Sequence, residues 1–215
     1  MSDYVRRLPV YLLLDCSGSM MGAPIEAVKQ GITTLLSELK GDPQALETAY
    51  LSVITFESTA RQVVPLTELI QFQAPAIEAS GMTALGGALN VLMDCMNNEV
   101  RKSTETQKGD WRPMVFIMTD GYPTDEDVLK SAAAKLKTMK TANIIACLCG
   151  DDANPEFLKQ ITECVLWMNT ITPGAMANFF RWVSSSIKMT SSSLSAKPGE
   201  NIQLPPPPTG FVVVP

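Results

Sequence analysis

Residues 8–24, LPVYLLLDCSGSMMGAP, contain the clearest fold signal in the chain. Residues 8–14 are apolar without interruption, which is typical of a strand buried on both faces of a parallel sheet. Residues 15–22 are rich in Gly and Ser and predict a loop. Pro24 then suits the first position of a helix. The stretch therefore predicts a strand, a loop and a helix in direct succession.

Further segments repeat this alternation along the chain. Apolar runs predict strands at residues 50–56, 61–66, 113–119, 143–149 and 165–168. One-sided apolar patterns predict helices that begin near residues 24, 85, 125, 155 and 173. Strands that alternate with helices form a parallel sheet with helices on both faces.

One pair of predicted strands departs from the parallel arrangement. Only residues 57–60 separate the strand at 50–56 from the strand at 61–66, so we expect an antiparallel hairpin. The expected fold class is α/β. It is a doubly wound, mostly parallel sheet with one antiparallel edge strand and helices on both faces.

The composition excludes several classes of function. The net charge of −5 disfavours nucleic acid or an anionic membrane as the main partner. Because the chain contains no histidine, a Ser-His-Asp triad, a Cys-His dyad and His-ligated zinc are impossible. The short apolar run that ends at Asp15 resembles neither a secretory signal nor a membrane span.

The cysteines indicate a reducing compartment. They are odd in number and several lie in apolar runs, which predicts buried, reduced thiols in a cytoplasmic protein. The five are Cys16, Cys95, Cys147, Cys149 and Cys164.

The C-terminal residues differ in composition from the rest of the chain. We therefore divide the chain into a domain at residues 1–190 and a Ser/Pro-rich tail at residues 191–215. Residues 205–208 are all proline, which favours polyproline II, and residues 211–214, FVVV, have the composition of a strand. The tail either stays floppy or packs back on its own domain, or it adds a strand to a partner's sheet.

Two acidic loops follow predicted strands. Asp15 follows the first strand and Asp120 follows the strand at 113–119. Doubly wound sheets bind ligands beyond the carboxyl ends of their strands, where the strand order reverses. We therefore expect both loops at one crevice, within reach of Thr83, which precedes a helix.

These loops contain the oxygen ligands that Mg²⁺ prefers. Ser17, Ser19 and Thr83 offer neutral hydroxyls, and Asp15 and Asp120 supply negative charge. In an extended D-x-S-x-S loop, alternate side chains point the same way. With only two carboxylates, a bound ion keeps a position for an acidic group from another molecule. Helix capping by Ser17 and Ser19 is the alternative interpretation.

The set Asp15-x-Ser17-x-Ser19, Thr83 and Thr119-Asp120-Gly121 resembles the metal-ion-dependent adhesion site of von Willebrand factor A domains. The resemblance spans roughly residues 8–190. It implies that Mg²⁺, with Mn²⁺ or Ca²⁺ as alternatives, is held by Asp15, Ser17, Ser19, Thr83 and Asp120. It also implies that a protein partner donates an Asp or Glu as a further ligand. Cys16 stands at a variable position of the family and is expected to point away from the ion.

Three stretches are also similar to the stand-alone bacterial proteins of tellurite-resistance operons, the TerY type. They are LLLDCSGSM at 12–20, GMTALGGAL at 81–89 and FIMTDGYPTD at 116–125. This resemblance implies a cytoplasmic scaffold in a tellurite and stress-resistance complex with a kinase and a phosphatase. The net charge and the lack of a long apolar run, not this resemblance, are the grounds for expecting neither nucleic acid binding nor membrane insertion.

An enzyme is the competing class of function. An Asp after the first strand, with Mg²⁺ beside it, occurs in phosphatases that form an aspartyl phosphate. Those enzymes need a second carboxylate two residues on, where this chain has Ser17. We therefore expect a non-enzyme. A scaffold that binds partners through its tail or an edge strand, without using metal, is the second alternative.

Overall fold

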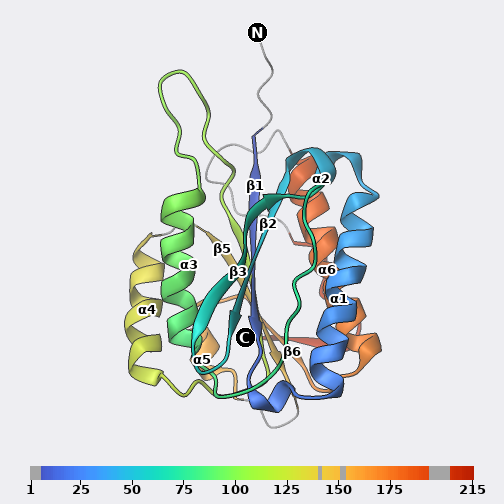
Figure 1. The fold of residues 1–215 in the computed structure, drawn as a ribbon, viewed down its shortest axis with the longest axis vertical. Coiled ribbons are helices and arrows are strands. Elements are labelled where there is room, and N and C mark those ends of the chain that lie inside the picture. The colour runs from blue at the N-terminus through green and yellow to red at the C-terminus, as the bar shows by residue number, and fades with distance from the viewer. Residues whose placement is uncertain (1–5, 140–141, 151–153, 194–203) are drawn as a thin grey trace.

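A computed structural model describes residues 6–139, 142–150, 154–193 and 204–215. They form three layers, with one sheet between two layers of helices (Figure 1). The strands are β1 (Leu8–Asp15), β2 (Ala49–Phe56), β3 (Ala60–Glu68), β4 (Met114–Thr119), β5 (Asn143–Cys149), β6 (Val165–Met168) and β7 (Phe211–Val214). The helices are the 3₁₀ turn η1 (Gly18–Met20), α1 (Ala23–Lys40), α2 (Pro43–Thr48), α3 (Leu85–Glu99), α4 (Glu126–Met139), α5 (Glu156–Lys159) and α6 (Pro173–Ser192).

The sheet confirms the expected fold class. Its strand order is β3-β2-β1-β4-β5-β6-β7. β1 pairs in parallel with β2 on one side and β4 on the other, and β5 and β6 continue the parallel arrangement. The predicted hairpin is present, because β3 is antiparallel to β2. Every residue of β1 is buried, as its uninterrupted apolar sequence indicates.

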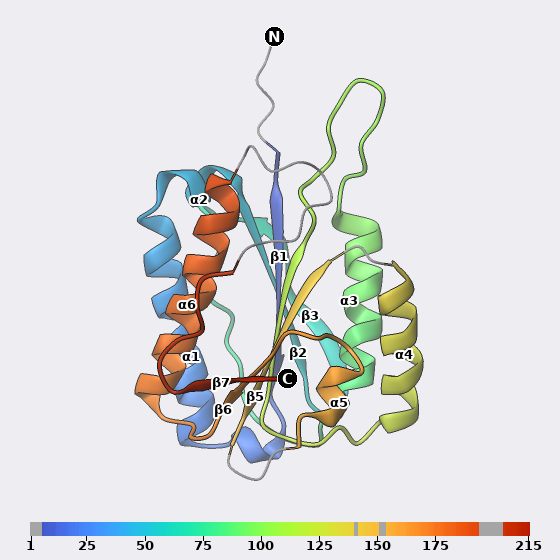
Figure 2. The ribbon, with the colours of Figure 1, turned by 180° about the vertical axis from the view of Figure 1, so that it is seen from behind.

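Each face of the sheet is covered by its own helices (Figures 1 and 2). On one face, Leu35 of α1 and Phe180 of α6 share a hydrophobic cluster with Leu12 of β1. On the other face, Leu89 of α3 packs in a second cluster with Leu13 of β1. Successive side chains of a strand point to opposite faces, so β1 contributes to both cores. Among the described helices, none combines the length and apolarity needed to cross a membrane.

The structure adds the helix α2 and the turn η1 to the elements expected from the sequence, and it pairs the strand-like residues 211–214 within this chain's own sheet. α2 begins after Asp42, whose carboxylate accepts a hydrogen bond from the amide of Ala45 at 2.8 Å. Asp42-Pro43 is itself a helix-start signal, so this helix was accessible to sequence reasoning. β7 pairs antiparallel with β6, and the sheet therefore has an antiparallel strand at each edge.

Residues 204–215 pack back on the domain, which is one of the conformations expected for the tail. The indole nitrogen of Trp182 donates to the carbonyl of Pro205 at 3.1 Å. Phe211 stacks on Phe179 with 6.0 Å between the ring centroids. The division between residues 190 and 191 stays a prediction, since residues 194–203 lie outside the described residues.

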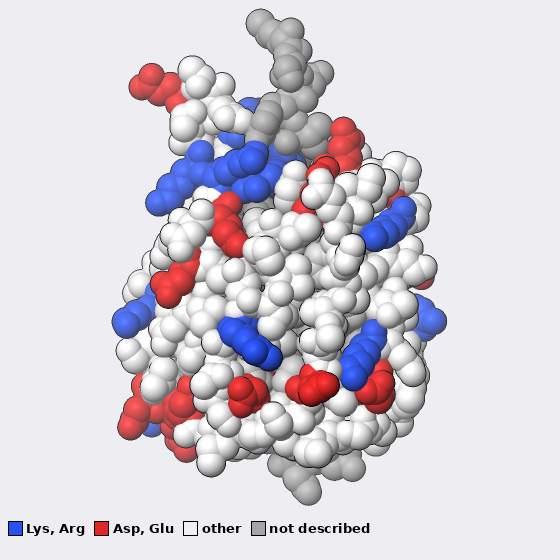
Figure 3. Space-filling model, in the orientation of Figure 1, with Lys and Arg blue, Asp and Glu red and all other residues white. Residues whose placement is uncertain are grey.

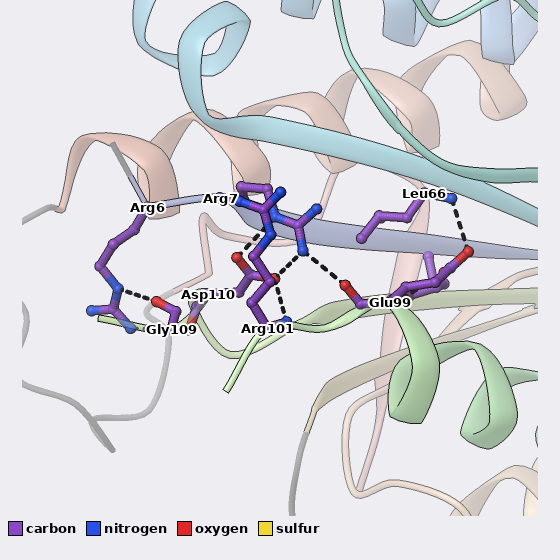
Figure 4. Close-up of polar contacts among 8 residues, drawn as sticks. Arg6, Arg7, Leu66, Glu99, Arg101, Gly109 and Asp110 are labelled. Carbon is purple, nitrogen blue, oxygen red and sulfur yellow. Dashed lines mark hydrogen bonds and ion pairs between the residues drawn. The ribbon is translucent and has the colours of Figure 1, made fainter. Parts of the chain in front are cut away.

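The end of the sheet where β1 begins is held by a buried ion pair (Figure 4). Nη2 of Arg7 lies 2.5 Å from Oδ2 of Asp110, whose side chain is 2% exposed. Asp110 also accepts from the amide of Arg101 at 2.8 Å, which closes the polar connection at residues 101–110. Arg7 donates to the carbonyl of Glu99 at 2.8 Å as well. This end of the molecule is therefore tied together by structural contacts.

Candidate metal site

The predicted site residues lie at the carboxyl ends of β1 and β4. These two strands are neighbours, but the chain leaves β1 toward β2 on one side and reaches β4 on the other. The loops after β1 and β4 therefore diverge from one point, which is where doubly wound sheets bind ligands. This end is the lower one in Figure 1, where η1 follows β1.

Asp15 is the buried carboxylate of the site, and hydrogen bonds hold it in place. It ends β1 and is 0% exposed. Its Oδ1 accepts from the amide of Ser17 at 2.8 Å, and its Oδ2 accepts a short hydrogen bond from the hydroxyl of Thr119 at the end of β4. The two strands are thus joined through this one carboxylate. Sequence reasoning assigned no role to Thr119, although it precedes Asp120 directly.

Ser17, Ser19 and Asp120 form a continuous chain of oxygens. Oγ of Ser17 lies 3.0 Å from Oγ of Ser19, which donates to Oδ1 of Asp120 at 2.7 Å. The expected reason for this convergence was wrong, because residues 18–20 form a 3₁₀ turn rather than an extended loop. The amide of Met20 donates to the carbonyl of Ser17 at 3.0 Å, and this turn brings the two hydroxyls together.

Thr83 reaches the same place through a loop that crosses from β3. The amide of Ser80 donates to the carbonyl of Cys16 at 2.8 Å, and the amide of Gly18 donates to the carbonyl of Gly81 at 3.0 Å. Gly81 has φ +72°, and a Cβ there would lie 2.4 Å from Oγ of Ser58. Only glycine satisfies both constraints. The loop therefore delivers Thr83, which is 6% exposed, to the metal loops.

Gly121 makes room for the hydroxyl of Thr83. A Cβ on Gly121 would lie 3.1 Å from Oγ1 of Thr83 and 3.8 Å from Oγ of Ser19. The hydroxyls of Thr83 and Ser19 therefore both face the backbone that follows Asp120. The structure brings all five predicted residues to one end of the sheet, from three separated segments.

Two further residues hold these segments in register. The amide and the hydroxyl of Thr124 both donate to the carbonyl of Thr83, at 2.9 and 3.2 Å. The carboxylate of Asp125 accepts from the amides of Gly86 and Gly87, at 3.0 and 2.8 Å. Asp125 thereby satisfies amides in the first turn of α3, whose N-cap residue makes no side-chain bond.

Sequence reasoning assigned neither residue to the site. Both residues directly precede α4 in the chain, yet Thr124 donates to the Thr83 loop and Asp125 caps α3. A signal did exist, because Gly86-Gly87 at the start of a helix leaves amides that some acceptor must satisfy. Its partner lies 38 residues away and could not be read from local pattern.

Burial raises the pKa of both site carboxylates. It raises the pKa of Asp15 to about 6, against hydrogen bonds from Thr119 and Ser17 that lower it. Burial also raises the pKa of Asp120, against the hydrogen bond from Ser19. The ion pairs of the described residues include neither carboxylate. The site thus holds buried negative charge with no protein cation beside it.

The donor set fits a small divalent cation. Neighbouring ligands of an octahedral Mg²⁺, each at about 2.1 Å, lie about 3 Å apart. The spacings Ser17–Ser19 and Ser19–Asp120, 3.0 and 2.7 Å, are of this size. Among the described residues, no three His, Cys, Asp or Glu side chains gather as a metal cluster. A metal here therefore depends on hydroxyl oxygens, as the sequence pattern predicts.

The cysteines do not contribute to this chemistry. All five are free, and four are buried, as predicted. Burial raises the pKa of Cys16 to about 12, so its thiol stays protonated and unreactive. Cys147 and Cys149 pack against each other with 3.9 Å between their sulfur atoms.

Comparison with known proteins adds a family match. A family model described as von Willebrand factor type A domain matches residues 10–175. An uncharacterized protein of Synechocystis sp. is 33% identical over 122 residues. That alignment covers 55% of this chain but 27% of the relative, so the chain spans only a small part of the relative's length.

Solved structures show the same fold at low sequence identity. A von Willebrand factor type A protein from Catenulispora acidiphila has a TM-score of 0.66 at 19% identity, covering 86% of this chain and 43% of that one. Proximal thread matrix protein 1 from the mussel byssus, described with a zinc-occupied MIDAS motif, has a TM-score of 0.60 at 18% identity. That match covers 87% of this chain and 46% of the byssus protein.

Proposed function

The chain belongs to the von Willebrand factor type A family, and from that premise we propose that it binds a protein partner through a divalent ion held by Asp15, Ser17, Ser19, Thr83 and Asp120. One observation carries the proposal. Ser17, Ser19 and Asp120 form a continuous row of oxygens, and the amide of Ser17 donates to the buried carboxylate of Asp15. Domains of this family are in general metal-dependent interaction modules.

The ion we propose is Mg²⁺, with Mn²⁺ or Ca²⁺ as alternatives. When bound, it would supply a positive charge with a coordination position open to a carboxylate from another molecule. The carboxylate of Asp15 is fixed by hydrogen bonds from the amide of Ser17 and the hydroxyl of Thr119. The carboxylate of Asp120 accepts a hydrogen bond from the hydroxyl of Ser19. The zinc-occupied motif of the byssus protein supports the general class of site.

The test is metal binding by the chain and by a single variant. Asp120→Ala removes the carboxylate that accepts from Ser19, and we expect Mg²⁺ affinity to fall at least about tenfold in calorimetric titration. The fold should persist, because Asp120 lies in a loop after β4. Asp94→Ala, on the exposed surface of α3, is the matched control and should bind as the parent chain does. Equal affinity in Asp120→Ala and parent would overturn the proposal.

A finer assignment follows from the likeness of three stretches to the TerY type. We propose that the chain acts in the cytoplasm as a scaffold of a tellurite and stress-resistance complex that includes a kinase and a phosphatase. The test is co-purification of tagged chain from tellurite-stressed cells, with Mg²⁺ and with chelator. Recovery of neither enzyme, or equal recovery in chelator, would contradict it.

The competing enzyme hypothesis lacks a second carboxylate. Phosphatases that form an aspartyl phosphate need one two residues after the nucleophile, and this chain has Ser17 there. The hydroxyl of Ser17 lies instead in the row of oxygens with Ser19 and Asp120. We therefore propose a non-enzymatic role. Trapping of a phosphate analogue on Asp15 in the presence of Mg²⁺ would reverse this conclusion.

A further inference from the structure

Three large apolar side chains are exposed at the metal site. Met21, Met82 and Tyr122 have 64%, 62% and 55% of their surface exposed. Each belongs to a different metal loop, within two residues of Ser19, Thr83 or Asp120. Large apolar side chains gathered on one surface mark an interaction site more often than scattered ones do.

Backbone hydrogen bonds join the loops that carry these three residues. The amide of Gly18 donates to the carbonyl of Gly81 at 3.0 Å, which joins the loops of Met21 and Met82. The amide of Thr124 donates to the carbonyl of Thr83 at 2.9 Å, which joins the loops of Met82 and Tyr122. We call Met21, Met82 and Tyr122 the apolar rim.

Local packing alone does not account for the exposure of the rim. Met20 is fully buried while its neighbour Met21 stays outside. Tyr122 is oriented by an edge contact with Phe157, at 5.4 Å between ring centroids, yet more than half of its surface remains exposed. Methionine side chains are flexible and polarisable, so they adapt to a partner's apolar surface.

The charges near the rim restrict the partner. Glu57 lies beside it, because its Oε2 would be 2.7 Å from a Cβ on Gly81. Asp125, Glu126 and Asp127 follow Tyr122 closely in the chain. Carboxylates also gather at the lower end of the molecule in Figure 3, whereas a basic cluster lies at the upper end. A partner with many acidic residues would be repelled at this end.

From these observations we infer that the rim recognises a peptide segment with a single acidic residue flanked by large apolar side chains. The acidic residue meets the metal site and the apolar neighbours pack on Met21, Met82 and Tyr122. This inference rests on the proposed function and adds the chemistry of the partner to it.

The experiment is selection from a displayed library of random peptides. Immobilised chain is panned in Mg²⁺, and bound peptides are released with EDTA and sequenced. We expect one Asp or Glu in each enriched peptide, with Leu, Met, Phe or Trp beside it. A synthetic copy of an enriched peptide should bind the triple variant Met21→Ser, Met82→Ser, Tyr122→Ser at least about tenfold more weakly than the parent chain.

Two controls make the result specific. The triple variant should bind Mg²⁺ as the parent does in calorimetry, since it keeps all five metal-site residues. The double variant Ile70→Ser, Met189→Ser removes apolar side chains that are 61% and 44% exposed, after β3 and in the last turn of α6. It should select the same peptides as the parent chain.

The outcomes separate the two proposals. Failure to enrich EDTA-released acidic peptides with the parent chain would overturn the proposed function and this inference together. Enrichment of acidic peptides with polar or charged flanks would overturn this inference alone. Unchanged apolar flanks with the triple variant would also overturn it.

Discussion

Asp15 shows how one residue can combine a structural and a functional demand. It ends a fully buried strand, joins β1 to β4 through Thr119, and accepts a hydrogen bond from the amide of Ser17 in the metal loop. Burial raises its pKa to about 6, well above the ordinary value of 3.8. Below about pH 6 this carboxyl group carries a proton, and it then accepts a cation only by releasing that proton.

The stability of the metal-free chain should therefore fall as the pH rises. The folded state binds the Asp15 proton more tightly than the unfolded state, so its contribution is complete below about pH 4 and is lost by about pH 6. The shift corresponds to about 3 kcal/mol. Thermal unfolding at pH 5 and 7.5 checks this, and Mg²⁺ should raise Tm more at pH 7.5. Equal Mg²⁺ effects at the two pH values would argue against the assignment of Asp15.

Asp125 is not one of the five proposed metal ligands, but it holds the start of α3 in place beside the site. Asp125→Ala removes the acceptor for the amides of Gly86 and Gly87 and should cost about 1–2 kcal/mol of unfolding free energy. It should also weaken Mg²⁺ binding, because the start of α3 immediately follows Thr83. Urea denaturation and calorimetric titration measure the two effects. Asp127→Ala, at an exposed position of α4, should change neither quantity.

At the scale of elements, one close helix contact joins α1 to α6. A Cβ on Gly31 would lie 2.1 Å from Cδ2 of Phe180, which is fully buried. The absence of a side chain at this one position lets the two helices approach over the sheet. The amphipathic pattern predicted both helices, but not which positions had to be small.

Gly31→Ala should therefore destabilise the chain in spite of alanine's higher helix propensity. We expect a loss of about 1–3 kcal/mol in urea denaturation, because Phe180 cannot move within a packed core. Gly174→Ala near the start of α6 is the matched control, since a Cβ there meets no atom within 4 Å. A loss of equal size in both variants would point to backbone effects instead of the α1–α6 contact.

At the scale of the whole molecule, the two sheet edges differ. β3 carries Arg61, Pro65 and Glu68, which suit an exposed edge. β7 carries Phe and Val only, and its Val212 and Val213 are 50% and 52% exposed. β7 nevertheless covers the edge of β6, which would otherwise be open to other chains.

Deletion of residues 204–215 should therefore lower stability and increase association. It removes the Phe211–Phe179 stack and the Trp182–Pro205 hydrogen bond, and we expect a loss of about 2–4 kcal/mol. Urea denaturation and light scattering would measure the two effects. Val212→Ser, on the exposed side of β7, should alter stability far less. A truncated chain as stable and as monodisperse as the parent would contradict this role.

The sequence by itself determined the fold class, the strand alternation and the identity of the five candidate ligands. Those features follow from local periodicity and from residue types in short loops, which neighbouring residues specify. Tertiary structure decided the rest. The Asp125 cap on α3, the close approach of Gly31 to Phe180 and the pairing of β7 with β6 all depend on contacts between distant segments. Only packing of the whole chain brings those segments together, so local pattern does not contain them.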